Sequence, residues 1–275
     1  MYRKIDKILI TLILLLVLSC RPISNYMEPD KPVYHKDFVK TALPAKDTIK
    51  VVTFNIKYAE EIDKALEELD EVRALRDADI ILLQEMDNAG TYTIAKYLDY
   101  NYLYYPASLQ HSGKDFGNAI LSKWPIEHYK KIILPYESPL NKRRRIAVTG
   151  VIDMGNTQIF TCSVHIETPW LETEYRVSQA DSLIRSIPGD YNYVIVGGDF
   201  NTASDESVEL TDKLFKSANF TWITDNIGWT QDFMGIKKFS LDHIFTKGMR
   251  LVDAGKFKET KASDHLPVWA TLVIE

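Results

Sequence analysis

The chain has 275 residues, 45% of them hydrophobic and 26% charged, which excludes a disordered or fibrous protein and is typical of a soluble globular one. Its 33 Lys and Arg are outnumbered by 38 Asp and Glu, so the formal net charge of −5 argues against a strong general affinity for nucleic acid. The chain has two cysteines, Cys20 and Cys162. Cys162 is expected on the same buried strand face as Phe160 and Val164, and because Cys20 is expected to carry a lipid, no internal disulfide is expected.

Residues 1–19 are predicted to be a signal peptide. Three basic side chains among the first seven residues precede an apolar run over 8–18 that is too short to span a bilayer. The run passes directly into Val-Leu-Ser-Cys, which resembles a bacterial lipobox ending at Cys20. We therefore expect an exported bacterial lipoprotein, lipidated at Cys20 and held at the cell envelope, facing the periplasm or the cell surface. The alternative is an incidental cysteine after a plain signal peptide.

Residues 20–47 are predicted to be a lipid-anchored flexible tether. The segment is rich in proline and polar residues and shows no apolar periodicity. Fully extended, it would reach at most about 90 Å, so the domain that follows could sit clear of the membrane and still remain near it.

Apolar segments rich in β-branched residues alternate with amphipathic segments over residues 48–275, which we interpret as one large domain. Residues 62–75 show apolar side chains at helical spacing, whereas residues 80–83 form the continuous apolar run of a strand buried on both faces. In chain order, strands are predicted at 49–54, 80–83, 102–105, 119–122, 146–152, 158–164, 193–196, 241–245 and 268–274. Helices are predicted at 62–75, 91–98, 173–187 and 207–217.

Several of these strands are apolar on both faces, yet many of the connections between them are too short to contain a helix. This combination predicts two stacked β-sheets with helices outside them, rather than a single doubly wound sheet.

Short polar motifs stand where several predicted strands end or begin. They combine Asn, Asp or Glu, and His in the segments Thr53-Phe54-Asn55, Leu83-Gln84-Glu85, Ser163-Val164-His165, Gly197-Gly198-Asp199-Phe200-Asn201, Leu241-Asp242-His243 and Ser263-Asp264-His265-Leu266-Pro267-Val268. Carboxylates and amides are the ligands of a hard divalent cation, and histidines transfer protons near neutral pH. A role in turn formation explains single Asn or Asp residues, but it does not explain Glu85 together with two histidines at corresponding places.

The order of these motifs resembles that of the endonuclease/exonuclease/phosphatase superfamily, which includes pancreatic deoxyribonuclease, abasic-site endonucleases, neutral sphingomyelinases and inositol polyphosphate phosphatases. The resemblance covers nearly all of residues 48–275 and implies that they form a catalytic domain. The implied fold is an α/β, four-layer sandwich of two stacked mixed β-sheets with helices on both outer faces, and with the site at one edge of the paired sheets. The implied activity is that of a divalent-metal-dependent phosphoesterase.

The resemblance also implies a metal site. Glu85 corresponds to the principal ligand of the cation, with Asn55 and Asp264 close to the ion. The expected cofactor is Mg²⁺, with Mn²⁺ or Ca²⁺ as alternatives. Mg²⁺ keeps several waters and takes only one or two carboxylates, which these residues can supply.

The catalytic residues are carried over from the resemblance in the same way. Asp199 and Asn201 correspond to the pair that orients the attacking water and a phosphoryl oxygen. Asp242 corresponds to the carboxylate that partners His265, and His165 to the second histidine that contacts phosphate. An Asp behind a His fixes the tautomer of the ring and favours its charged form.

Two further segments are candidates for substrate binding. Asn118 lies in a segment that also fits the family, where it could contact substrate or His165; the alternative is a turn residue entering a strand. The basic run before residue 146 would place Arg144 or Arg145 on a phosphate, and the alternative is a solvated edge of charged side chains.

The substrate itself is left open by the sequence. We expect hydrolysis of phosphodiester bonds by in-line attack of an activated water on nucleic acid or a small phosphodiester. The alternative is a lipid headgroup phosphodiesterase of sphingomyelinase type, for which the membrane anchor argues, although no apolar hairpin is evident in the sequence. An inactive phosphate-binding module is the third possibility. No obligate protein partner is indicated, and we expect a monomer.

Overall fold

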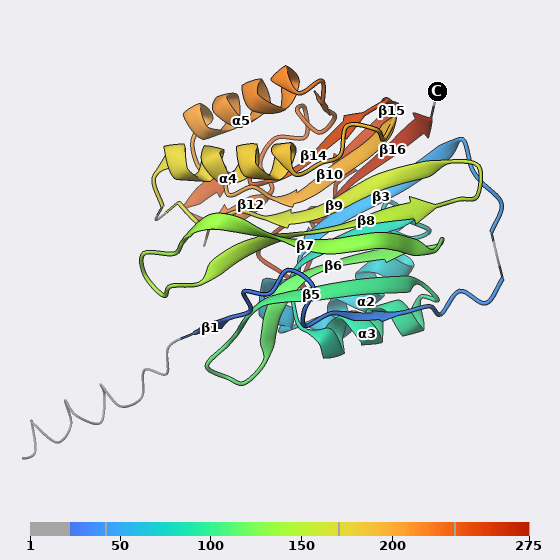
Figure 1. Cartoon of the computed structure of the whole chain (residues 1–275), viewed down its shortest axis with the longest axis horizontal. Helices are drawn as coiled ribbons and strands as arrows, with labels where there is room; N and C mark the ends of the chain where they lie inside the picture. The colour runs from blue at the N-terminus through green and yellow to red at the C-terminus, as the bar shows by residue number, and fades with distance from the viewer. Residues whose placement is uncertain (1–22, 42, 170, 234, 275) are drawn as a thin grey trace, which may run out of the picture.

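The computed structural model describes residues 23–41, 43–169, 171–233 and 235–274, and these residues form two stacked β-sheets with helices on both outer faces (Figure 1). Helices α2 (Ile62–Glu71) and α3 (Asn88–Tyr97) cover one sheet. Helices α4 (Thr173–Arg185) and α5 (Asp205–Ser217) cover the other. The predicted four-layer α/β sandwich is confirmed.

The first sheet has eight strands and is mixed, with β3 and β4 parallel and the other neighbours antiparallel. Its order is β1 (Ser24–Asn25), β5 (Asn101–Leu109), β6 (Asp115–Ser122), β4 (Ile80–Met86), β3 (Thr48–Asn55), β16 (Val268–Ile274) and β15 (Met249–Lys256), and β2 (Tyr34–Lys36) also pairs with β5. A short 3-10 helix, η1 (Lys57–Ala59), follows β3.

The second sheet has six strands and is also mixed, with β9 and β10 parallel. Its order is β11 (Thr221–Trp222), β14 (Asp242–Lys247), β10 (Tyr193–Asp199), β9 (Gln158–His165), β8 (Arg144–Asp153) and β7 (Ile126–Glu137). A separate two-stranded hairpin is formed by β12 (Gln231–Phe233) and β13 (Lys237–Phe239).

Three apolar layers hold the sandwich together. The central layer, between the sheets, contains Leu82, Ile120, Val148, Ile195 and Ile244, all with no exposed surface. Each such side chain contributes about 1.5–3 kcal/mol when it is fully removed from water. Because β4 is packed on both faces, its sequence is apolar at every position from 80 to 83, as the unbroken run predicted.

All nine predicted strands and all four predicted helices are present, but two long strands were missed. β7 and β15 are the last strands of their sheets, and both carry charged or exposed residues along much of their length. Edge strands are commonly charged because this discourages pairing with other chains. The apolar alternation on which the predictions relied is therefore absent from these two strands.

The prediction of a flexible tether over 20–47 is wrong for the part of this segment that the structure describes. Strands β1 and β2 both pair with β5 and complete the first sheet. Lys131 of β7, in the second sheet, donates hydrogen bonds to the carbonyl oxygens of Tyr26 (2.8 Å), Lys31 (3.1 Å) and Pro106 (3.4 Å). A polar, proline-rich segment can still supply backbone groups to an open sheet edge, so composition alone did not reveal this docking.

The segment therefore forms a strap over residues 23–41, which runs along β5 from its last residues to its first. Ser24 pairs with Leu109 at one end of β5, and Lys36 pairs with Tyr102 near the other. The predicted signal peptide over 1–19 and the lipidation site Cys20 lie outside the described residues. No helix in the described part of the chain is both long and apolar enough to cross a bilayer.

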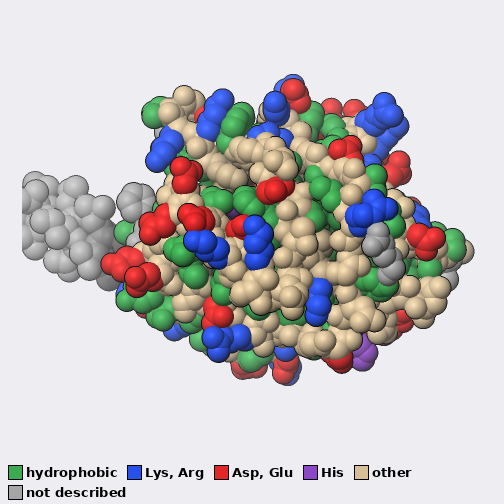
Figure 2. Space-filling model, turned by 90° about the horizontal axis from the view of Figure 1, so that it is seen from above, with side chains coloured by type: hydrophobic (Ala, Val, Ile, Leu, Met, Phe, Trp, Pro, Cys, Tyr) green, Lys and Arg blue, Asp and Glu red, His purple; other side chains and the backbone are tan. Residues whose placement is uncertain are grey.

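The outer face over α4 and α5 carries no broad area of one charge. Figure 2 shows Lys and Arg side chains interspersed there with Asp and Glu. This mixed surface agrees with the formal net charge of −5 and offers no basic stripe of the kind that tracks a nucleic-acid backbone.

Candidate active site

One edge of the sandwich collects the strand ends that carry the polar motifs. Asn55 is the last residue of β3, and Asp199 is the last residue of β10. Strand pairing places Asp199 opposite His165 in β9 and opposite Asp242 in β14. Gly198 permits this close pairing, because a Cβ there would lie 1.9 Å from the carbonyl oxygen of the neighbouring strand and its φ is +152°.

Glu85 reaches the site because β4 is irregular just before its end. A register shift between Leu83 and Met86 marks a bulge, and Glu85 has a φ of 58°, a conformation that non-glycine residues rarely adopt. Its Oε1 lies 3.4 Å from Asn55 Nδ2, and its Oε2 accepts a hydrogen bond of 3.1 Å from the Tyr58 backbone. Bulges beside active sites commonly redirect one side chain, and here that side chain is Glu85.

Asp199 lies at the centre of the cluster. Its Oδ2 accepts a hydrogen bond from Asn55 Nδ2 (3.0 Å), and its Oδ1 accepts one from the Asn201 backbone (2.9 Å). Burial is the largest influence on this carboxyl group and, with the negative charges of Asp242 and Glu85, raises its pKa to about 7. The nearby His265 and the Asn201 backbone N–H oppose that shift.

Asp242 and His265 form a buried carboxylate–imidazole pair. Asp242 Oδ2 lies 2.9 Å from His265 Nδ1 and also accepts a hydrogen bond from the Thr230 hydroxyl (2.7 Å). Burial opposes the charged form of His265, but the charges of Asp242 and Asp199 outweigh it and raise the pKa of the ring to about 10. The expected pair of Asp242 and His265 is therefore present, and His265 Nε2 lies 3.9 Å from Asp199 Oδ2.

The pKa of the second histidine of the site, His165, is shifted in the opposite direction. It is fully buried, and its Nε2 lies 3.4 Å from Asp199 Oδ2 and 3.8 Å from Glu85 Oε1. Burial, followed by the positive charge of Arg145, holds its pKa well below the usual value. The Arg145 guanidinium lies 3.0 Å from His165 Nε2 and is paired with the buried Glu167, 3.4 Å away.

Of the basic run, residues 143 and 145 face the site and residue 144 does not. Arg143 is only 6% exposed, and its guanidinium lies 4.0 Å from the centre of the Phe116 ring. Its Nε is buried without a hydrogen-bond partner among the described residues. Alternation along β8 turns Arg144 away from Arg145, so of the two arginines named in advance only Arg145 faces the site, and Arg143 was not named.

Asn118 and Asn201 are held by backbone hydrogen bonds. Asn118 Nδ2 donates to the carbonyl oxygens of Ile146 (3.0 Å) and Ser163 (3.3 Å), which joins β6 to two strands of the other sheet. Asn118 has no exposed surface, so the structure places it beneath the site rather than at its opening. Asn201 has a φ of 50°, and its Nδ2 donates to the carbonyl oxygen of Ile166 (2.9 Å).

Asp264 is connected to the cluster through Gln231 of β12. The Gln231 amide nitrogen lies 3.0 Å from His265 Nε2 and 3.4 Å from Asp264 Oδ2. A β-bridge between Gln231 and His265 fixes this contact. Gln231, like Glu167, has no motif around it, and only the folded arrangement reveals it.

The donor atoms of the site fit a divalent cation. Asp199, Asp242 and His265 each present an atom within 4.8 Å of the others, and His265 Nδ1 is already paired with Asp242. Glu85 is the more accessible carboxylate, with 13% of its side chain exposed against 2% for Asp199, and Asn55 lies between them. Carboxylates that converge in this way repel one another unless a cation or a proton is added. We therefore favour Glu85 and Asn55 as the residues nearest the ion.

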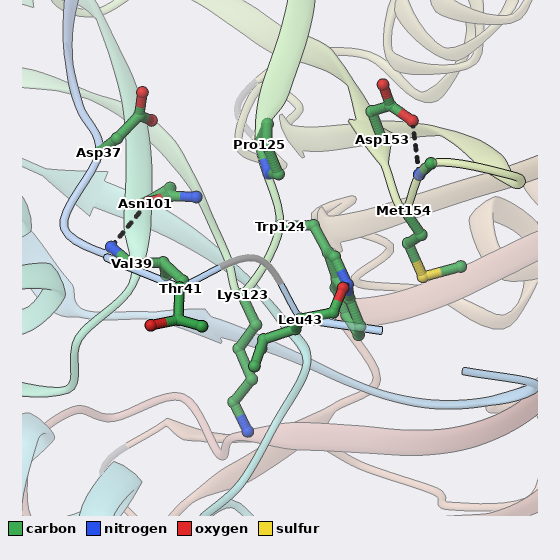
Figure 3. A pocket seen from close by; sticks show the side chains of 11 residues that line it. Asp37, Val39, Thr41, Leu43, Asn101, Lys123, Trp124, Pro125, Asp153 and Met154 are labelled. Carbon is green, nitrogen blue, oxygen red and sulfur yellow. Dashed lines mark hydrogen bonds between the residues drawn. The ribbon is translucent and has the colours of Figure 1, made fainter. Parts of the chain in front are cut away.

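A separate hollow lies away from this cluster. It has a volume of about 410 Å³ and is drawn in Figure 3, where Leu43 of the N-terminal segment, Trp124 and Met154 line it. These residues belong to the edge of the sandwich opposite the clustered carboxylates. The hollow contains no residue of the polar motifs.

Residues 52–265 match the model of the Endonuclease/Exonuclease/phosphatase family. Comparison with curated proteins gives no match.

Three solved structures illustrate the likeness of the fold. An endonuclease/exonuclease/phosphatase from Bacteroides vulgatus is 17% identical, with a TM-score of 0.67 over 84% of this chain and 100% of that one. D. rerio TDP2, solved with a single-strand DNA product, is 16% identical, with a TM-score of 0.65 over 82% of this chain and 99% of that one. A mannosyl-6-phosphatase from Bacteroides thetaiotaomicron VPI-5482 is 17% identical, with a TM-score of 0.61 over 82% of this chain and 100% of that one.

Proposed function

The chain belongs to the endonuclease/exonuclease/phosphatase family, whose members hydrolyse phosphoester bonds, and from this premise we propose that it is a divalent-metal-dependent phosphodiesterase. The observation that carries the proposal is the convergence of Glu85, Asp199, Asp242 and His265 on one edge, from strands far apart in the chain. A buried cluster of this kind costs free energy in folding, which supports a positively charged ligand, and family membership supports a phosphoester substrate.

Glu85, Asn55 and Asp264 would hold the cation, and the expected ion is Mg²⁺, with Mn²⁺ or Ca²⁺ as alternatives. When bound, the ion supplies positive charge to the phosphoryl oxygens as negative charge develops on them. Asn55 is positioned for this by its hydrogen bonds to the carboxylates of Glu85 and Asp199.

The chain's own residues carry the proton transfers. Asp199, with Asn201, orients the attacking water and accepts its proton. His265, held by Asp242, stabilises the charge on the phosphoryl group or protonates the leaving oxygen. Arg145 and His165, next to each other behind Asp199, add positive charge and hydrogen-bond donors for the phosphate.

Location forms part of the proposal. The lipobox motif at Cys20 supports export and lipid anchoring at the cell envelope, and the chain is proposed to act as a monomer. The structural neighbours include a protein bound to a single-strand DNA product and a sugar phosphatase, so the shared fold leaves the type of ester open.

The test is a panel of hydrolysis assays on the purified full chain with Mg²⁺, Mn²⁺ or a chelator. The panel contains plasmid DNA, RNA, sphingomyelin, an artificial phosphodiester and a phosphomonoester, with Asp199→Asn as the matched inactive control. We expect metal-dependent hydrolysis of at least one diester that the control lacks. Hydrolysis of the monoester alone would contradict the diesterase assignment. No turnover of any ester by a metal-loaded chain would favour an inactive phosphate-binding module.

A further inference from the structure

Exposed apolar side chains gather on the loops around the active-site edge. Leu140, in the loop between β7 and β8, is 68% exposed, and Tyr58, after β3, is 39% exposed. Phe233 and Ile236, at the turn of the β12–β13 hairpin, are 51% and 80% exposed. Ile236 is the most exposed large apolar residue among those the structure describes. Apolar side chains grouped in this way around an active site indicate a surface that contacts something apolar.

Two hydrogen bonds from backbone N–H groups join the described residues at the turn of the β12–β13 hairpin. Asp232 Oδ1 accepts a hydrogen bond of 2.8 Å from the Gly235 backbone, and the Phe233 carbonyl oxygen accepts one of 2.9 Å from the Ile236 backbone. The next two residues, 237 and 238, are exposed lysines. An apolar tip followed by two lysines is complementary to a bilayer that contains anionic phospholipids.

The base of the same hairpin touches the catalytic residues. Gln231, the first residue of β12, lies 3.0 Å from His265 and 3.4 Å from Asp264. The hairpin spans only nine residues from Gln231 to Phe239, so its tip cannot be far from the site. Whatever the tip contacts is therefore close to the reacting phosphate.

The N-terminal strap begins at this edge as well. Asn25 Nδ2 donates to the Lys142 carbonyl oxygen (2.8 Å), and Asn25 Oδ1 accepts from the Arg144 backbone (3.0 Å). Figure 1 shows β1 at the edge of the molecule that also carries the loops after β5 and β7. Cys20 precedes Ser24 by four residues, which span at most about 15 Å when fully extended. A lipid on Cys20 would therefore hold this edge, and no other, close to the bilayer.

We propose that the active-site edge is a membrane-docking surface, in which the tip of the β12–β13 hairpin enters the headgroup region of an anionic phospholipid bilayer. This proposal rests on the proposed function for its consequence: the substrate is a phosphoester presented at the bilayer surface. The lipid anchor and the hairpin act together, since both approach the bilayer from the same edge. The strap keeps the distance between anchor and active site short, which a flexible tether would not.

The test places a polarity-sensitive fluorophore on the full chain in a Cys20→Ser background, in which the remaining cysteine, Cys162, is fully buried. One label is attached at Ile236→Cys and the control label at Tyr97→Cys, which is 63% exposed at the end of α3 on the opposite edge. Vesicles contain phosphatidylcholine and phosphatidylglycerol with brominated lipid as a quencher. We expect quenching at 236 and none at 97. Equal quenching at the two positions would overturn the proposal.

A second measurement separates docking from catalysis. The double variant Phe233→Ser with Ile236→Ser should hydrolyse a vesicle-embedded phosphoester about tenfold more slowly, because two apolar side chains no longer enter the bilayer. Its turnover of a soluble phosphodiester should equal that of the unmodified chain. Unchanged hydrolysis on vesicles would contradict docking. If neither protein hydrolyses any phosphoester, the proposed function fails, and the quenching experiment alone decides whether the edge docks.

Discussion

The two edges of the sandwich treat a buried carboxylate in opposite ways. At the opposite edge, Asp79 is 3% exposed and is satisfied by Lys46 Nζ at 2.6 Å and by the Lys50 backbone N–H at 2.9 Å. At the active-site edge, Asp199 is 1% exposed and faces the carboxylates of Asp242 and Glu85. The first arrangement stabilises the folded chain without any ligand. The second leaves Asp199 beside two other carboxylates, which favours the addition of a cation or a proton and is the physical mark of a functional site.

Backbone strain does not separate the two edges. At the active-site edge, Glu85 and Asn201 have φ values of 58° and 50°. Beside Asp79, the residues Asp77 and Asp99 have φ values of 60° and 55°. The difference between the edges therefore lies in how each buried carboxylate is paired.

The largest effect is expected for a substitution of Asp199, with a substitution of Asp79 as the matched control. Asp199→Asn should lower turnover by at least about 10²-fold because the group that accepts the water's proton is lost, while the fold is retained. Asp79→Ala should leave turnover unchanged and lower the free energy of unfolding by about 1–3 kcal/mol, since the Lys50 N–H loses its acceptor. Steady-state kinetics and urea denaturation measure the two quantities. A loss of turnover in Asp79→Ala comparable to that in Asp199→Asn would contradict the assignment of a purely structural role to Asp79.

A second prediction concerns the cation directly. Glu85→Gln removes one negative charge from the group nearest the proposed ion, so affinity for Mn²⁺ or Mg²⁺ should fall at least about tenfold. Isothermal titration calorimetry on the metal-free protein measures this without any substrate. The same substitution relieves repulsion with Asp199, so the metal-free variant should not be less stable than the unmodified chain. Wild-type metal affinity in Glu85→Gln would remove this residue from the metal site.

The basic run offers a matched pair of adjacent arginines at the start of β8. Arg143→Ala should raise KM for a phosphodiester about tenfold, because a buried guanidinium that faces the site is lost. Arg144→Ala should change KM by less than about twofold, because its side chain points to the other face of β8. Initial-rate kinetics on one soluble diester compare the two. Equal increases in KM for the two variants would contradict the placement of Arg143 at the site and of Arg144 away from it.

The smallest predicted effect concerns the buried side chain of Lys131 and the dependence of stability on pH. Lys131 is 2% exposed, and burial lowers its pKa to about 8, partly offset by Glu28. Because the unfolded chain binds this proton more tightly than the folded chain does, stability should rise with pH above about 8, by about 1 kcal/mol per pH unit at most. Thermal unfolding of Lys131→Met should lack this rise. Parallel pH profiles for the two proteins would show that the carbonyl oxygens of the strap keep Lys131 charged.

The sequence determined the buried strands, the helices and most of the residues that meet at the site. Strands buried on both faces, such as β4, are recognisable because every position is apolar, and the amphipathic helices are recognisable by their spacing. Asn55, Glu85, His165, Asp199, Asp242 and His265 could be named in advance because each stands in a short motif at a strand end. Such motifs meet at one edge in any sheet that pairs these strands in register.

Tertiary structure alone decided how the neighbouring segments complete that site. Alternation implies that Arg143 and Arg145 share a face, but only packing against Phe116 decides that this face is inward. Gln231 meets His265 through a contact 34 residues apart in sequence, which no local pattern encodes. Strands β1 and β2 of the strap pair through backbone groups, and these are the same for every residue type except proline, so a polar, proline-rich sequence gives no sign of whether they find partners.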